Sequence, residues 1–173
     1  MQNARQISLN ANYFISHLRL RSHPEGGFFK EVYRSEESIA SKALPARFKG
    51  ERNLATSIYY LLRQGQHSLF HRIKSDEGWH FYAGHTLLIH IIETGGKYYS
   101  IKLGSNIYLG ETFQYVVPAK AWFAAEPAPG SEFSLCGCTV SPGFDFADFE
   151  IADKKELLNS FPEHKEIIGR LSR

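Results

Sequence analysis

The stretch GQHSLFHRIKSDEGWHFYAG, residues 65–84, carries five of the most chemically useful side chains in the chain: His67, His71, Asp76, Glu77 and His80. Histidines and carboxylates together are the ligands of many metal sites and the proton carriers of many acid/base sites. They can also be no more than the polar positions of two paired strands. Which of these three interpretations holds decides what the sequence says about fold and function.

The sequence around this stretch is dominated by short β-strands. Across residues 54–140, runs rich in aromatic and β-branched residues alternate with turns that contain glycine or proline. A short helix capped by Asn10 comes first, residues 147–171 return to helical spacing, and the polar segment 36–52 is expected to be a long excursion. Because aromatic residues alternate along several strands, we expect an all-β barrel or jelly roll in which some of them line a pocket.

Composition and charge limit the class of protein. At 173 residues, with 43% hydrophobic and 22% charged residues, the chain suits one soluble globular domain over residues 1–173. The net charge of +2 and the scattered basic residues argue against nucleic acid as a partner. No segment approaches the roughly 18 apolar residues of a membrane span, and residues 1–12 lack a signal pattern, so we expect a cytoplasmic protein. In that reducing compartment Cys136 and Cys138 should be buried free thiols.

The spacing of the opening stretch matches a known pattern, in which the relevant positions are Gly65, His71, Ile73, Glu77 and Gly84. It resembles the first conserved motif of the cupin superfamily, G-x5-H-x-H-x3-4-E-x6-G. The phrases HPEGGFFKEVYRS, SIYYLL, SDEGWHFYAG, VPAKAWFAA and CTVSPGFDFADFE, in this order, narrow the resemblance to the DUF985 or cupin-5 family. The resemblance therefore covers most of the chain.

The resemblance implies a double-stranded β-helix, the cupin jelly-roll barrel, with short flanking α-helices and a pocket inside one end. It also implies a homodimer, in which we expect the HPEGGFFKEVYRS segment to approach the partner subunit. Some cupins hold iron, manganese or zinc through histidines and a glutamate. Others, the dTDP-4-keto-6-deoxyhexose epimerases, have a similar form and work without metal through a histidine base and a tyrosine acid.

The metal interpretation lacks ligands. Where metal-binding cupins carry a second and a late histidine, this chain has Ile73 and Phe123, so only His71 and Glu77 remain. Two ligands are too few for tight binding of a transition metal. His80 could be recruited, but residues three apart on a strand, such as Glu77 and His80, point to opposite faces. The sequence therefore predicts no metal and no other cofactor.

The acid/base interpretation needs fewer groups. We expect His71 to take a proton from a carbon next to a carbonyl group, with Glu77 fixing the tautomer of the imidazole. A carboxylate beside His71 should raise its pKa unless burial outweighs the pairing. Tyr59 is the candidate acid on the opposite face of the ligand, with Tyr82 and Tyr115 as alternatives.

Other polar and aromatic side chains complete the predicted site, and the expected ligand-binding residues are Glu25, Lys30, His80, Gln114 and Trp122. We expect a protein that binds a small polar ligand, with a sugar nucleotide as one candidate, and performs metal-independent epimerase- or isomerase-like chemistry. A metal-dependent cupin enzyme of the dioxygenase or lyase type is one alternative. A ligand-binding protein without catalysis is the other.

Overall fold

The computed structural model describes residues 9–173. Residues 1–8, which belong to the segment without a signal pattern, lie outside the described part. The helices are α1 (Ala11–Leu18), α2 (Lys154–Ser160) and α3 (Lys165–Leu171), with single 3-10 turns η1 (Ser41–Ala43), η2 (Ile107–Leu109), η3 (Phe146–Asp148) and η4 (Pro162–His164). The strands are β1 (Arg21–Ser22), β2 (Phe28–Arg34), β3 (Ser38–Ile39), β4 (Arg52–Asn53), β5 (Thr56–Arg63), β6 (His71–Arg72), β7 (Asp76–Gly84), β8 (Leu87–Ile92), β9 (Tyr98–Leu103), β10 (Gln114–Val117), β11 (Trp122–Pro127), β12 (Phe133–Ser141) and β13 (Glu150–Ile151).

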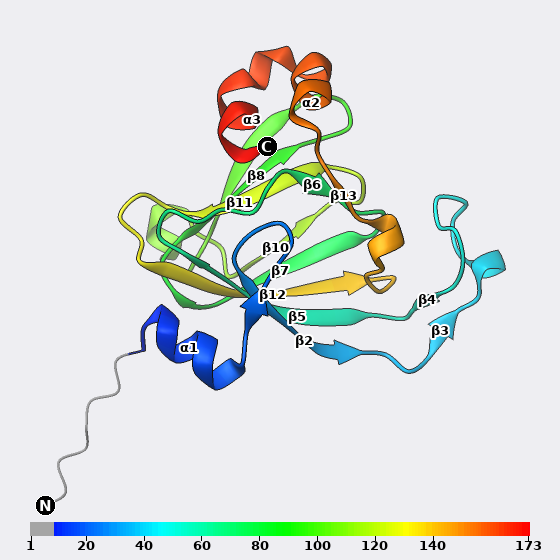
Figure 1. The fold of residues 1–173 in the computed structure, drawn as a ribbon, viewed down its shortest axis with the longest axis horizontal. Helices are drawn as coiled ribbons and strands as arrows, with labels where there is room; N and C mark the ends of the chain where they lie inside the picture. Colours follow the sequence, from blue (N-terminus) through cyan, green and yellow to red (C-terminus); the bar gives the residue numbers. More distant parts are fainter. Residues whose placement is uncertain (1–8) are drawn as a thin grey trace, which may run out of the picture.

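Two antiparallel sheets face each other and form the body of the molecule (Figure 1). The larger sheet has the strand order β1-β2-β5-β12-β7-β10, and the smaller sheet has the order β13-β6-β11-β8-β9. Aromatic and β-branched residues favour these strands because such side chains pack well on a pleated, half-buried surface. The predicted all-β fold class with short flanking helices is confirmed.

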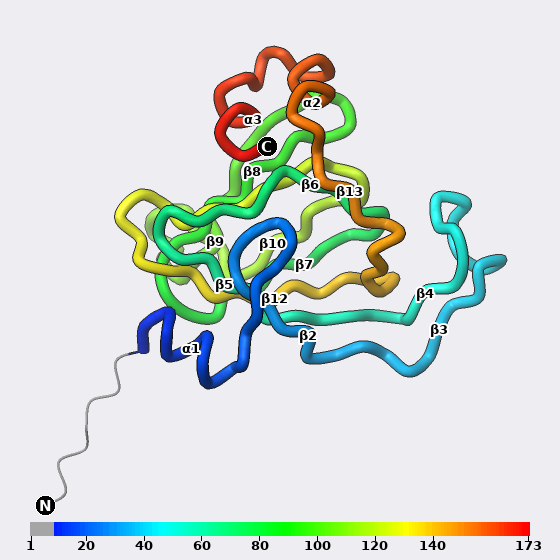
Figure 2. The backbone as a smooth tube through the Cα atoms, viewed as in Figure 1, coloured from blue at the N-terminus to red at the C-terminus, as the bar shows by residue number. Residues whose placement is uncertain are grey.

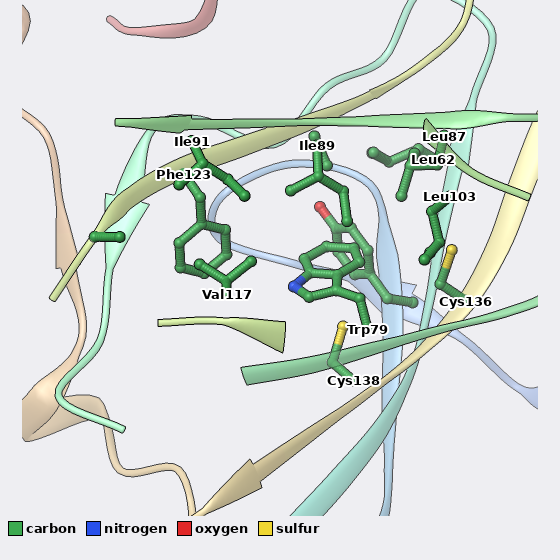
Figure 3. Close-up of a cluster of buried hydrophobic side chains, with 13 residues drawn as sticks. Leu62, Trp79, Leu87, Ile89, Ile91, Leu103, Val117, Phe123, Cys136 and Cys138 are labelled. Atoms are coloured by element: carbon green, nitrogen blue, oxygen red, sulfur yellow. The ribbon is translucent and has the colours of Figure 1, made fainter. Parts of the chain in front are cut away.

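The core fills the space between the two sheets. Trp79 of β7 is fully buried, and its ring packs edge-on against Tyr60 of β5 and Phe123 of β11, with centroids 5.8 and 6.3 Å away. Figure 3 shows the Trp79 indole below aliphatic side chains of β8 and close to its cross-strand neighbour Cys138. Cys136 and Cys138 are both buried and unbridged, as predicted.

Short helices cover the outer faces of both sheets, on opposite sides of the molecule (Figure 1). Helix α1 begins at the predicted cap Asn10, whose Oδ1 accepts the N–H of Tyr13 at 2.9 Å, and its Phe14 packs against Phe133 of the larger sheet. Helices α2 and α3 pack on the smaller sheet, with Ile168 completely buried. No helix within residues 9–173 has the length and apolar character needed to cross a membrane.

The polar segment 36–52 has regular structure of its own. Strands β3 and β4 pair antiparallel and project beyond the end of the two main sheets (Figure 2). Arg52 of β4 is buried and donates from Nε and Nη2 to the carboxylate of Asp148, at 2.6 and 2.7 Å. Lys74 adds a third contact to Asp148 at 3.0 Å. The Arg52–Asp148 ion pair ties the excursion to η3, which lies at the rim of a cavity.

Candidate active site

A cavity of about 380 Å³ opens between the two sheets at one end of the molecule. Its wall is formed by β1, β2, β5, β6, β7 and β12, together with the loop before β2 and the segment that carries η3. Its buried polar side chains include those of His23, Glu25, His71 and Glu77. Sites for small molecules occupy roughly 300–1,000 Å³, so this cavity suits a small metabolite.

The HPEGG loop, residues 23–27, reaches from the larger sheet to the segment that precedes β6. The N–H of Leu69 donates to the carbonyl of Glu25 at 2.9 Å, and the Tyr60 hydroxyl donates to the carbonyl of Gly26 at 2.8 Å. Gly26 has a φ of +119°, and a Cβ at this position would lie 2.2 Å from the carbonyl oxygen of His67. Only glycine allows this close approach, which places the Glu25 side chain beside β6.

Glu25 and His71 are in direct contact in the cavity wall. Glu25 Oε2 lies 3.1 Å from His71 Nε2, and the two side chains are 7% and 3% exposed. On the other side of the imidazole, Nδ1 lies 2.7 Å from the carbonyl oxygen of Leu69. A carbonyl oxygen can only accept, so Nδ1 carries a proton, and Nε2 of the neutral ring is an acceptor. A proton that passes between the two side chains must therefore come from the Glu25 carboxyl group.

Burial favours this neutral arrangement. Desolvation raises the pKa of Glu25 well above its usual range, and the charge of Glu77 raises it further. Desolvation also lowers the pKa of His71 to about 3, although the hydrogen bond to the Leu69 carbonyl acts in the opposite direction. A rise in the His71 pKa was expected only where pairing outweighs burial, and here burial is the larger effect. Near neutral pH the shared proton stays on the carboxyl oxygen.

His23 lies on the other side of Glu25 and was not among the site residues predicted from the sequence. Its Nδ1 accepts the backbone N–H of Glu25 at 3.3 Å and lies 3.7 Å from Glu25 Oε1. Its ring packs edge-on against Phe29, with centroids 4.5 Å apart, and burial lowers its pKa to about 4. His23 is therefore a neutral part of the cavity wall. Its position in the HPEGG phrase, two residues before Glu25, is the sequence feature that could have identified it.

Glu77 faces the same cavity from β7 and does not hold His71. Burial raises the pKa of Glu77 to about 7, and the thiol of Cys138, which hydrogen-bonds to it, opposes this rise in part. The expected partner of His71 is therefore replaced by Glu25. The reason is that the HPEGG loop brings its own carboxyl group up to the imidazole, a contact between distant parts of the chain.

The rim of the cavity is aromatic and is formed by Phe144, Phe146 and Phe149, whose ring centroids lie 5.1 to 6.1 Å apart. The N–H of Phe144 donates to Thr56 Oγ1 at 2.9 Å, and its carbonyl accepts from Arg34 Nη1 at 3.1 Å. Arg34 also donates from Nε and Nη2 to the carboxylate of Glu31. Arg34 therefore holds the aromatic rim in place, and Glu31 neutralises its charge.

Four predicted site residues lie together but outside the cavity. They are Lys30, Tyr59, His80 and Gln114, and they form a row across the larger sheet. In this row Lys30 pairs with Tyr59, His80 pairs with Gln114, and Gly137 pairs with both Tyr59 and His80. Paired residues share a face of the sheet, and neighbours along a strand alternate. Because Tyr60 and Trp79 point into the core, the whole row points outward. Tyr59 is therefore not placed to act as an acid in the cavity.

The remaining aromatic candidates also lie away from the cavity. Tyr82 is 50% exposed, and Tyr115 packs on the core with its hydroxyl bonded to that of Tyr99 at 3.1 Å. Trp122 points outward because its neighbour Phe123 points inward, and the guanidinium carbon of Arg72 lies 4.3 Å from its ring centroid. None of the tyrosines in residues 9–173 lines the cavity.

The donor set does not fit a cupin metal site. Both ring nitrogens of His71 already have partners, the Leu69 carbonyl and Glu25. Ile73 and Phe123 stand at the ligand positions, and the Phe123 ring packs 4.0 Å from the His71 ring. Within the described part of the chain, no group of three or more histidine, cysteine, aspartate or glutamate side chains is arranged to hold an ion.

Known proteins resemble this chain in sequence and in fold. Residues 12–152 match Cupin_5, described as cupin superfamily (DUF985). An uncharacterized protein of Saccharomyces cerevisiae is 32% identical over 173 residues, which cover 90% of this chain and 78% of that protein.

Solved structures show the same likeness. A protein from Shewanella oneidensis is 42% identical, with a TM-score of 0.85 over 96% of this chain and 99% of that one. A hypothetical protein from Leishmania major is 33% identical, with a TM-score of 0.85 over 94% and 98% of the two chains. Oxalate decarboxylase from Bacillus subtilis shares only the fold, with 16% identity and a TM-score of 0.53 over 87% of this chain and 36% of that one. The chain has the cupin β-barrel fold and belongs to the Cupin_5 (DUF985) family of the cupin superfamily.

Proposed function

We propose that the cavity binds a small polar carbonyl compound and that Glu25 and His71 move a proton along its carbon skeleton, as in an isomerase. The observation that carries this proposal is the close approach of two buried side chains in the cavity wall, with Glu25 Oε2 and His71 Nε2 3.1 Å apart. No lysine or arginine within residues 9–173 pairs with either group. The proton can therefore pass between Glu25, His71 and a ligand without a fixed cation holding it on one side.

The pair can balance the proton transfers by itself. Glu25 gives its proton to the carbonyl oxygen of an α-hydroxy carbonyl ligand, which frees His71 Nε2. That nitrogen takes the proton from the adjacent carbon, and the C–H electrons form the double bond of an enediol. The carboxylate left on Glu25 makes the imidazole more basic at that moment. His71 then delivers this proton to the former carbonyl carbon, and the hydroxyl group on the carbon that lost the proton gives its own proton to Glu25. Both side chains return to their starting protonation states.

The position of the tyrosines favours isomerisation over epimerisation. Epimerisation at one carbon requires a second proton carrier on the opposite face of the ligand, and no tyrosine of the described residues lines the cavity. Isomerisation needs only the one face that Glu25 and His71 provide. If the ligand is a sugar nucleotide, only the sugar would lie inside the 380 Å³ cavity, with the nucleotide at the phenylalanine rim.

Isotope exchange tests this proposal. The protein is incubated in heavy water with keto sugars, amino sugars and dTDP-4-keto-6-deoxyglucose, and proton NMR follows the loss of the C–H signal next to the carbonyl. We expect exchange that falls about 100-fold or more in His71→Ala and less in Glu25→Gln. His90→Ala, which alters a histidine outside the cavity, is the control. Unchanged exchange in His71→Ala, or tight binding without any exchange, would refute the proposal, and the second result would favour a binding protein.

We also propose that a second copy of the chain covers the open edge of the larger sheet. Strand β1 pairs only with Phe28 and Phe29, so β2 has a free edge beyond them, where Val32 and Tyr33 are 45% and 55% exposed. Free edges tend to pair with another strand, and two identical chains can do so across a two-fold axis. Light scattering should then give a dimer of the 19.7 kDa chain. A monomer at all practical concentrations would contradict this.

A further inference from the structure

Glu77 has no part in the proton that Glu25 and His71 share. It is 7% exposed and lines the cavity, and no N–H or O–H group of residues 9–173 hydrogen-bonds to its carboxyl group. The thiol of Cys138 is a weak donor. A buried carboxyl group without a good partner is costly, so most such groups are hydrogen-bonded or paired. The Glu77 oxygens are not among the enclosed atoms that lack a partner, and the side chain lines the cavity, where a ligand can supply a strong donor.

Among the described residues, none on the inner wall of the cavity carries a fixed positive charge that would repel a cation. His23 and His71 are neutral, because burial lowers their pKa values to about 4 and about 3. The arginines that line the cavity are Arg21 and Arg34, both on its exposed side. Arg34 is neutralised by Glu31, and the solvent around Arg21 screens its charge. The charge that can develop inside is therefore negative.

Aromatic rings add to this preference. Four phenylalanines line the cavity: Phe29, Phe144, Phe146 and Phe149. The face of an aromatic ring attracts a cation, and the attraction is stronger where water is excluded. The face of Phe29 is already covered by the Arg21 guanidinium, whose carbon lies 5.0 Å from the ring centroid. A buried carboxyl group and the aromatic faces of Phe144, Phe146 and Phe149 remain, and these are surroundings that favour an ammonium group.

We infer that the ligand of this cavity carries a protonated amine, which donates to the carboxylate of Glu77 while the carbonyl of the ligand faces Glu25 and His71. This inference rests on the proposed function, and it narrows the substrate class to small amino-carbonyl compounds such as amino sugars or α-amino ketones. A neutral sugar would leave Glu77 without a charged partner. A carboxylic acid would place a second negative charge beside it.

Simple aromatic probes test the inference by calorimetry at pH 8. We expect benzylammonium to bind about tenfold or more tightly than benzyl alcohol, and benzoate to bind most weakly. Glu77→Gln should weaken benzylammonium about tenfold or more and leave benzyl alcohol unchanged. Glu126→Gln, which alters a carboxylate outside the cavity, is the matched control. Tighter binding of benzoate than of benzylammonium, or equal affinity of parent and Glu77→Gln for benzylammonium, would overturn the inference. So would binding of zinc or manganese chloride at Glu77 with no binding of benzylammonium.

Proton release gives a second measurement that needs no variant. At pH 6.5 benzylammonium should displace the proton from Glu77, whose pKa is about 7, and titrations in two buffers of different ionisation enthalpy should detect its release. The titratable groups around Glu77 do not supply it. Glu25 and Cys138 have raised pKa values and keep their protons, and His71 is already the neutral imidazole. Binding without proton release would contradict the assignment to Glu77.

The two proposals fail in different experiments. If His71→Ala abolishes isotope exchange but Glu77→Gln leaves benzylammonium affinity unchanged, the proposed function stands and the amine site does not. If Glu77→Gln lowers that affinity while His71→Ala exchanges normally, the amine site stands and the proton-transfer function does not.

Discussion

Two histidine–glutamate pairs in this protein have the same separation and opposite electrostatics. His71 Nε2 and Glu25 Oε2 are 3.1 Å apart in the cavity wall, and His90 Nε2 and Glu126 Oε1 are also 3.1 Å apart on the outer side of the smaller sheet. Within residues 9–173, only the second pair has a cation beside it, because Arg170 of α3 hydrogen-bonds to Glu126.

The cation decides which partner holds the proton. Burial alone would raise the pKa of Glu126, but the hydrogen bond and charge of Arg170, together with His90, outweigh it and lower the pKa. Glu126 is then a carboxylate, which accepts from His90 Nε2–H, and His90 Nδ1 accepts from the Tyr98 hydroxyl at 2.8 Å. Glu25 has no such cation and keeps its proton. Geometry alone therefore does not define an acid/base pair, and a third charged group does.

The largest effect is expected when the His71–Glu25 pair is broken and the His90–Glu126 pair is left intact. In Gly26→Ala the new Cβ would meet the backbone of His67 at 2.2 Å at a φ of +119°, so the HPEGG loop must move and take Glu25 with it. We expect a loss of more than about 3 kcal/mol in the free energy of unfolding, measured with urea. Gly65→Ala is the matched control, because Gly65 also has a positive φ but no atom within 4 Å of its Cβ position, and it should cost about 1 kcal/mol. Equal losses would show that the loop contact is unimportant.

The second prediction compares carboxyl groups with and without a cation. The pKa of Glu77 rises from 4.5 to about 7 on folding, so its contribution to stability is present below pH 4.5 and is lost as the pH rises through 7. Glu77→Gln cannot ionise and should be roughly 2–3 kcal/mol more stable than the parent at pH 8, with little difference at pH 4.

Glu126→Gln should have the opposite sign. The pKa of Glu126 is lowered on folding, so its contribution is present at neutral pH and is lost on acidification. The variant should be less stable than the parent at pH 8. Denaturant unfolding of both variants between pH 4 and pH 8 checks this, and changes of the same sign would refute the role assigned to the cation.

A smaller effect is expected when the His90–Glu126 pair loses its cation and so resembles the His71–Glu25 pair. Arg170→Gln removes the cation from Glu126, so the pKa of Glu126 should rise, as carbon-13 NMR titration of its carboxyl group would show. Because Arg170 is about half exposed, the loss of stability should be only about 1 kcal/mol or less. An unchanged pKa would mean that burial and His90, rather than Arg170, control Glu126.

The smallest effect concerns only the position of one proton. His71 should carry its proton on Nδ1, which faces the Leu69 carbonyl, and His90 should carry its proton on Nε2, which faces the Glu126 carboxylate. Nitrogen-15 NMR of the two imidazoles at pH 7 distinguishes the tautomers. The same tautomer in both rings would contradict the protonation assigned to Glu25.

The sequence predicted the inward strand positions well where a motif gave the register. The spacing of the opening stretch identified His71 and Glu77, which both line the cavity. It failed for Tyr59, which stands next to another aromatic residue, Tyr60. With two aromatics in a row the alternation has no preferred register, and a shift of one residue exchanges the inner and outer faces. Trp122 and Phe123 present the same ambiguity.

The sequence by itself determined the all-β architecture, the helix that begins at Asn10, the free thiols and the absence of a complete set of cupin metal ligands. These follow from local patterns, because side-chain alternation, capping and motif spacing act between residues close together in the chain. Only the tertiary structure decided that Glu25 holds His71. That contact depends on the close approach of Gly26 to a distant segment, and the protonation of the pair depends on how much water and charge the fold leaves around it.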